Sequence, residues 1–183
     1  MGDSGARMSQ SIVLADVSRS LARFLRKELQ ADPAVGPWMD SDERISLDSP
    51  HALQEDGAVR LSLYLYHVFT DQTPRTRVPM RVEPGPRHEP PLVVNLLYLV
   101  TPVTGTPVEQ QTLLAAAMRA LHRKPLVEGA DLFGAAVSLG EPVRLTASPL
   151  TLEETARLWQ SLGMSHRPSV CYAVRLVLPQ SGS

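Results

Sequence analysis

The sequence predicts an α+β fold in which helices flank one mixed β-sheet. Residues 59–69 and 170–178 alternate apolar and polar side chains with the period of two that a strand requires. Two other segments begin with a Thr-x-x-Glu capping box, at Thr106 and at Thr151, and continue with the apolar spacing of a helix. Because extended and helical segments follow one another along the chain, we expect a single sheet that carries helices on one or both faces.

The composition fits one soluble globular domain. The chain has 183 residues, of which 43% are hydrophobic and 20% charged, so it contains enough apolar material for one core. Its net charge of -1 provides no general attraction to nucleic acid. Cys171 is the single cysteine and cannot form a disulfide within the chain, which agrees with assembly in a reducing cytoplasm. No run approaches the roughly 20 apolar residues of a membrane span, and the start of the chain lacks the apolar core of a signal peptide.

The first helix is predicted over residues 11–30. Its apolar residues recur three and four positions apart and therefore share one face. They are Leu14, Val17, Leu21, Phe24 and Leu25. Residues 1–10 and 179–183 are expected to be flexible tails, which leaves residues 11–178 as a single domain.

Strands are predicted on both sides of a proline-rich segment. Residues 44–47 favour a short edge strand and residues 59–69 a longer one. The longer strand is expected to place on one face Val59, Leu61, Leu63, Leu65 and Phe69. Residues 70–91 contain six prolines, which cannot donate to a sheet ladder, so this segment is expected to be loop or edge extension. Residues 92–100 are apolar on both faces, which is typical of a central strand covered on both sides.

The second half of the chain is predicted to contain two helices and two strands. The first of these helices has Pro107 at its first position and ends near Arg123. Its inward residues are expected to be Leu113, Leu114, Ala117, Met118 and Leu121. The second helix is expected to bury Leu152, Ala156 and Trp159. Residues 143–147 and 170–178 favour strands.

The residue types that commonly carry catalysis form no recognisable site. None of the five histidines pairs with another histidine or with Cys171 at the short spacing of a zinc site. His67 could be a ligand or base, but we favour a histidine that is hydrogen-bonded at the margin of the sheet. Cys171 lies in a strand and is expected to be a buried structural thiol, while helix capping explains Glu153 and Glu154. The sequence also lacks a phosphate-binding glycine loop, so we predict no cofactor, no metal and no enzymatic activity.

The arginines of residues 70–91 are the most informative charges. They are Arg75, Arg77, Arg81 and Arg87. One interpretation is a solvated hairpin. Another is a proline-stiffened arm whose arginines pair with carboxylates of a neighbouring subunit. Nucleic-acid binding is a third interpretation, but this segment has no Phe, Tyr or Trp on which bases could stack.

Five segments resemble, in the right order, motifs of one protein family. They are LSLYLYHV from residue 61, PPLVVNLLYLVT from residue 90, residues 109–125, VRLT at 143 with LTLEE through LW at 158–159, and YAVR from residue 172. Over residues 10–178 the chain resembles the cap, or tail-terminator, proteins of extracellular contractile injection systems of the antifeeding-prophage type. Gln110 stands where that family often has histidine.

The resemblance implies a fold like that of phage tail terminators and a hexameric ring that closes the distal end of an inner tube. It also implies contact with the inner tube protein and with the last sheath layer, within a contractile, phage tail-like particle. Whether other cap paralogues stack on the ring stays open. The family has no active site. The alternatives are a tail-completion or adaptor protein of a contractile phage tail, and an enzyme of unrecognised type.

A ring of this kind must close through lateral contacts between subunits. Such contacts use apolar and arginine anchors, or free strand edges that can pair. We therefore predict partner binding first by Arg75, Arg77 and Arg81. Further candidates are the edge strand at Ile45 and the exposed face of the first helix.

Overall fold

The computed structural model describes residues 3–70, 92–139 and 141–178, with side chains of the first helix from Ile12 onward. The strands of these residues form one six-stranded sheet in the order β1-β2-β3-β6-β5-β4. They are β1 Ile45–Ser46, β2 Leu61–Thr70, β3 Leu92–Pro102, β4 Leu126–Val127, β5 Val143–Ala147 and β6 Val170–Leu178. Strand β1 is parallel to β2 and the other pairs are antiparallel, so the predicted mixed sheet is confirmed.

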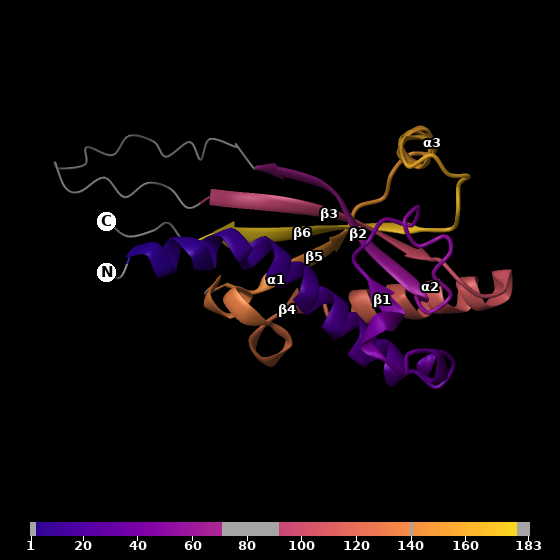
Figure 1. Ribbon diagram of the computed structural model, residues 1–183, viewed down its shortest axis with the longest axis horizontal. Coiled ribbons are helices and arrows are strands. Elements are labelled where there is room, and N and C mark those ends of the chain that lie inside the picture. Colours follow the sequence, from indigo (N-terminus) through magenta and orange to yellow (C-terminus); the bar gives the residue numbers. More distant parts are fainter. Residues whose placement is uncertain (1–2, 71–91, 140, 179–183) are drawn as a thin grey trace.

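Helices lie on both faces of the sheet, but they cover these faces unequally. The α-helices are α1 Asp3–Gln30, α2 Pro107–Arg123 and α3 Leu152–Ser161. Short 3-10 helices are η1 Gly36–Trp38, η2 Asp42–Arg44, η3 Gly129–Asp131 and η4 Gly134–Leu139. Helices α1 and α2 lie on one face, which we call the inner face, and α3 stands over the opposite, outer face (Figure 1).

The core is built between the inner face and helices α1 and α2. Its strand residues alternate along β2, β3 and β6, because every second side chain of a strand points to the same face. They include Leu61, Leu63, Val94, Leu96, Tyr98, Val100, Tyr172, Val174 and Leu176. The predicted stripe of the first helix packs against them: Val17, Leu21, Phe24 and Leu25 are buried, and Leu14 is partly buried.

Helix α1 is longer than predicted. It begins at Asp3 rather than at residue 11, so residues 3–10 of the expected tail are helical. Once a helix is nucleated, each further residue adds one hydrogen bond, and residues 3–10 contain no proline that would stop this extension. The expected tail at residues 179–183 lies outside the described residues.

A β-bulge in β2 reverses the predicted alternation of its second half. Leu65 pairs with Tyr98 and His67 pairs with Leu97, so Tyr66 is the additional residue. One extra residue moves every later side chain to the other face. Phe69, which was predicted to share the inner face with Leu61, is therefore 44% exposed on the outer face.

Two helical predictions were wrong for a shared reason. Met118 of α2 was expected to point inward but is 43% exposed. In α3 only Trp159 is buried, whereas Leu152 is 89% exposed and Ala156 is also exposed. Periodicity identifies the apolar side of a helix, but it does not determine how much of that side meets the sheet.

The outer face of β3 is covered only toward the end of the strand. Leu99 is 1% exposed, while Val93 and Leu97 are half-buried. The prediction of a central strand is confirmed, but the prediction that both faces are covered holds only for this end. The difference follows from the place of α3, which stands over one end of the sheet (Figure 1).

Residues 133–135, for which the sequence predicted no helix or strand, dock on α1 through buried polar contacts. Asp16 and Ser20 are buried in α1. The backbone N–H of Ala135 donates to Asp16 Oδ2 at 2.9 Å, and that of Phe133 donates to Ser20 Oγ at 2.8 Å. Gly134 lies between these donors with a φ of 56°, and a Cβ there would approach Asp16 Oδ2 to 2.3 Å. Only glycine fits this position without displacing Asp16.

We predict that Gly134→Ala lowers the free energy of unfolding by at least about 1–2 kcal/mol, because it adds left-handed backbone strain to a steric clash. Urea titration followed by circular dichroism measures this loss. Gly57→Ala is the matched control, because an added Cβ at Gly57 meets nothing within 4 Å. Equal stability of the two variants would show that η4 does not depend on this close approach.

Candidate protein-interaction site

The structure describes only some of the residues predicted for partner binding. Arg75, Arg77 and Arg81 lie outside the described residues, so their role stays a prediction. Ile45 lies in β1 at the edge of the sheet, as predicted, but its side chain is 7% exposed and belongs to the core. Ile45 can therefore offer a neighbour its backbone, while the neighbouring Leu47 is 37% exposed.

The exposed side of α1 borders a groove, which we call the α1–β1 groove. It has a volume of about 290 Å³ and combines basic and apolar side chains. Its lining consists of Arg19, Ala22, Arg23, Arg26, Asp42, Ile45, Leu47 and Phe133. Arginines outnumber carboxylates in this lining, so the groove favours a partner that is both acidic and apolar.

Each arginine of the α1–β1 groove is held by a neighbour. Arg19 Nη1 lies 3.0 Å from Asp16 Oδ1, and Arg26 Nε lies 2.6 Å from Asp42 Oδ1. The guanidinium of Arg23 instead lies over the ring of Phe133, 5.1 Å from its centroid. A cation over an aromatic face keeps its charge available to a further anion. Arg23 is thus the groove residue best placed to meet a partner's carboxylate.

Sequence reasoning identified the exposed face of the first helix but missed the groove as a site. Arg19, Arg23 and Arg26 recur four and three positions apart, and this spacing was a usable signal for a basic stripe. Phe133 gave no such signal, because it reaches Arg23 only through the docking of η4 on α1.

The start of α3 presents a second exposed surface. The predicted capping box is present: Thr151 N–H donates to Glu154 Oε2 at 2.8 Å, and Glu154 N–H donates to Thr151 Oγ1 at 3.2 Å. The hydrogen bond from the Thr151 backbone lowers the pKa of Glu154, which stays ionised. This cap fixes the first turn of α3, and the side chain of Leu152 in that turn is exposed to solvent.

A groove of about 310 Å³ lies beside α3 and is mostly apolar. Leu99 and Cys171 from the outer face line it together with Leu158. Burial raises the pKa of the Cys171 thiol, and burial likewise raises the pKa of the nearby Tyr66 hydroxyl. A nucleophilic cysteine needs the opposite shift, so a structural role agrees with this setting. The thiol is half-buried, however, and not buried as expected.

The remaining candidates for chemistry do not assemble into a site. His67 is exposed on the outer face, with its ring 5.7 Å from that of Phe69. Within the described part of the chain, no three His, Cys, Asp or Glu side chains gather where they could hold a metal ion. None of the helices in that part combines the length and apolarity needed to cross a membrane.

The sequence matches a family model described as the Pvc16 N-terminal domain over residues 16–183. The chain belongs to this family. No curated protein matches the sequence.

The solved structures to which the chain is similar include the following two. One is the sheath/tube terminator of the extracellular contractile injection system PVC in its extended state, with a TM-score of 0.57 and 18% identity. The other is the tube terminating cap of the anti-feeding prophage, also with a TM-score of 0.57 and with 22% identity. Each match covers 92% of this chain, which spans 57% and 56% of the two matched chains, respectively. The resemblance to cap or tail-terminator proteins is thereby confirmed for family and fold.

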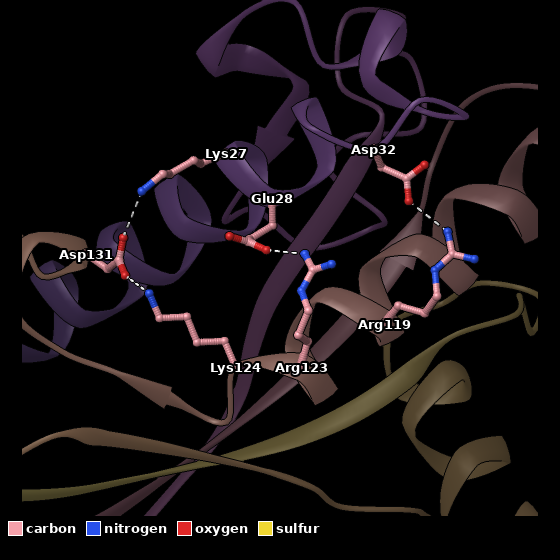
Figure 2. Close-up of polar contacts among 7 residues, drawn as sticks. All are labelled: Lys27, Glu28, Asp32, Arg119, Arg123, Lys124 and Asp131. Atoms are coloured by element: carbon pink, nitrogen blue, oxygen red, sulfur yellow. Dashed lines mark hydrogen bonds and ion pairs between the residues drawn. The ribbon is translucent and has the colours of Figure 1, made fainter.

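Ion pairs join α1 to α2 and η3 in this member of the Pvc16 N-terminal domain family (Figure 2). Arg119 Nη2 lies 2.8 Å from Asp32 Oδ2, and Arg123 pairs with Glu28. The carboxylate of Asp131 forms ion pairs with two lysines. Its Oδ2 pairs with Lys124, and its Oδ1 lies 3.5 Å from Lys27 Nζ. Three carboxylates and four cationic side chains take part in these ion pairs. They are Glu28, Asp32 and Asp131, with Lys27, Arg119, Arg123 and Lys124.

The ion pairs lower the pKa of two carboxyl groups. The hydrogen bond from Lys124 holds the pKa of Asp131 below its ordinary value of 3.8. The pKa of Asp32 is lowered first by the backbone N–H of Ala34 and then by Arg119. A carboxyl group whose pKa is lower in the folded state than in the unfolded state stabilises the fold at pH values above its unfolded-state pKa. This stabilisation is lost as the pH falls through its folded-state pKa.

We predict that the free energy of unfolding falls as the pH is lowered below about 5, because Asp32 and Asp131 must take up protons. Asp131→Asn should lower the stability at pH 7 by about 0.5–1 kcal/mol and should flatten the acid part of the profile. Urea titrations between pH 3 and pH 7 measure both effects. The exposed Glu55→Gln serves as the control, and a profile for Asp131→Asn that is parallel to that of the control would contradict the prediction.

Proposed function

We propose that this protein is a structural cap that terminates the inner tube and anchors the last sheath layer of a contractile injection system. The observation that carries the proposal is the likeness of its fold, over 92% of the chain, to a sheath/tube terminator and to a tube terminating cap. Membership of the Pvc16 N-terminal domain family supports the same function. The cap would be assembled in the cytoplasm as part of a particle that acts outside the cell.

The proposed assembly is a hexameric ring that rests on the last ring of the tube. A stack of rings grows because each ring presents a face that binds the next ring. This ring-to-ring contact is heterologous and leaves a free binding face at the end of the stack. A terminator must bind that face and present a different one on its other side. The unequal covering of the sheet supports this role, because α1 and α2 cover the inner face while much of the outer face stays open (Figure 1).

The function requires recognition surfaces rather than a catalytic centre. The α1–β1 groove supplies arginines beside apolar side chains, which are typical anchors of protein interfaces. The groove beside α3 is mostly apolar, and burial raises the pKa of its thiol. These properties favour binding of protein segments over acid–base or nucleophilic chemistry.

We predict that the purified protein forms six-fold rings in negative-stain electron micrographs. Removal of its gene should broaden the length distribution of the tubes and reduce the fraction of tubes that carry sheath. Restoring the gene on a plasmid is the control and should return both properties to those of the parent strain. Particles of normal length with normal sheath in the deletion strain would contradict the capping function.

A further inference from the structure

The start of α3 leaves an apolar side chain in solvent that the fold does not use. We call Leu152, Glu153 and Ala156 the α3 patch. Leu152 is 89% exposed, and Ala156, one helical turn later, is also exposed. The capping box at Thr151 shows that this turn is ordered, so the exposure of Leu152 does not result from fraying. Because this turn is already ordered, covering Leu152 with a partner costs little further conformational entropy.

The charge of the α3 patch is negative. The side chain of Glu153 is 73% exposed, and among the described residues its ion pair is with Arg157 of the same helix, at 2.5 Å. Such exposed pairs within one helix contribute little, so Glu153 can exchange this partner for another at small cost. Glu154 adds a second carboxylate in the same turn.

The α1–β1 groove has the complementary character. Its exposed Leu47 and Phe133 can receive an apolar side chain, and Arg23 can receive a carboxylate. Its volume of about 290 Å³ admits a few side chains rather than a whole domain. The first turn of a helix, with one leucine beside one glutamate, matches both its size and its charge.

We infer that the α3 patch of one copy docks in the α1–β1 groove of a neighbouring copy. Leu152 packs on Leu47 and Phe133, and Glu153 pairs with Arg23. The two surfaces cannot meet within one molecule, because α1 lies on the inner side of the sheet and α3 on the outer side (Figure 1). The contact is therefore between copies, and it joins two different surfaces of the same chain.

Such a contact is heterologous, and a heterologous contact closes into a ring when its rotation permits. The inference thus rests on the proposed ring and assigns to it the lateral interface. It also gives a role to the exposed side of α3, a helix of which only Trp159 is buried.

Charge reversal tests the pair. Glu153→Arg and Arg23→Glu should each raise the protein concentration for half-assembly by at least about tenfold, because each places like charges opposite one another. The double variant restores opposite charges and should recover most of that loss. Sedimentation velocity measures assembly, and thermal unfolding checks the fold of each variant. Glu55→Arg is the control for a charge reversal at an exposed site outside both surfaces.

Disulfide cross-linking provides a second test that does not depend on charge. In a Cys171→Ser background, Leu152→Cys combined with Leu47→Cys should give a ladder of covalent oligomers on mild oxidation. Leu152→Cys combined with Val108→Cys is the control, because Val108 is 72% exposed and lies outside the groove lining. Cross-links that form equally with the control pair would overturn the assignment.

The outcomes separate this contact from the proposed function. Rings that persist in both single reversals would overturn the contact while leaving the ring intact. Single reversals that break the ring without rescue in the double variant would also overturn it, because Glu153 and Arg23 would then meet other parts of the ring and not each other. A wild-type protein that stays monomeric in solution and at tube ends would overturn the ring and this contact together.

Discussion

Helix α1 crosses the inner face of the sheet and brings the rest of the molecule into position. Its apolar stripe, represented by Val17 and Leu25, supplies the helical side of the core. On the same helix, Asp16 accepts a hydrogen bond from the η4 segment, and Ser18 is hydrogen-bonded to Tyr98 of β3 at 2.6 Å. Burial of Tyr98 raises its pKa to about 12. Most buried polar groups in proteins are hydrogen-bonded, so these contacts also help to determine the position of α1.

The position of α1 has consequences for every surface that a partner could use. Its outward side forms one wall of the α1–β1 groove, and its C-terminal end pairs with α2 through Arg119 and Arg123. Helices α1 and α2 fill the inner side, whereas α3 is the one α-helix of the described residues over the outer face, and it buries a single residue, Trp159. The molecule therefore has two unlike sides. A subunit that ends a stack needs such a difference, because its two sides must meet different neighbours.

The partner-binding residues expected from the sequence stay a prediction. The expected arginine anchors, Arg75, Arg77 and Arg81, lie outside the described residues, whereas the expected face of the first helix borders a basic groove. Phe133 could not be predicted, because it reaches Arg23 only where the backbone N–H groups of Phe133 and Ala135 donate to α1 side chains more than a hundred positions away. The exposure of Leu152 was equally hidden, since a leucine in the first turn of an amphipathic helix normally indicates burial.

By itself the sequence determined the order of the α-helices and of every strand except the two-residue β4, both capping boxes and the central place of residues 92–100. These features depend on neighbours a few positions away, where hydrogen bonding and side-chain period act directly. Only the tertiary structure decided that the bulge at Tyr66 turns Phe69 outward and that η4 docks over Gly134. It also decided that α3 stands over one end of the sheet. Each of these results depends on contacts between segments that are distant in the sequence. Such contacts leave no pattern among neighbouring residues from which they could be predicted.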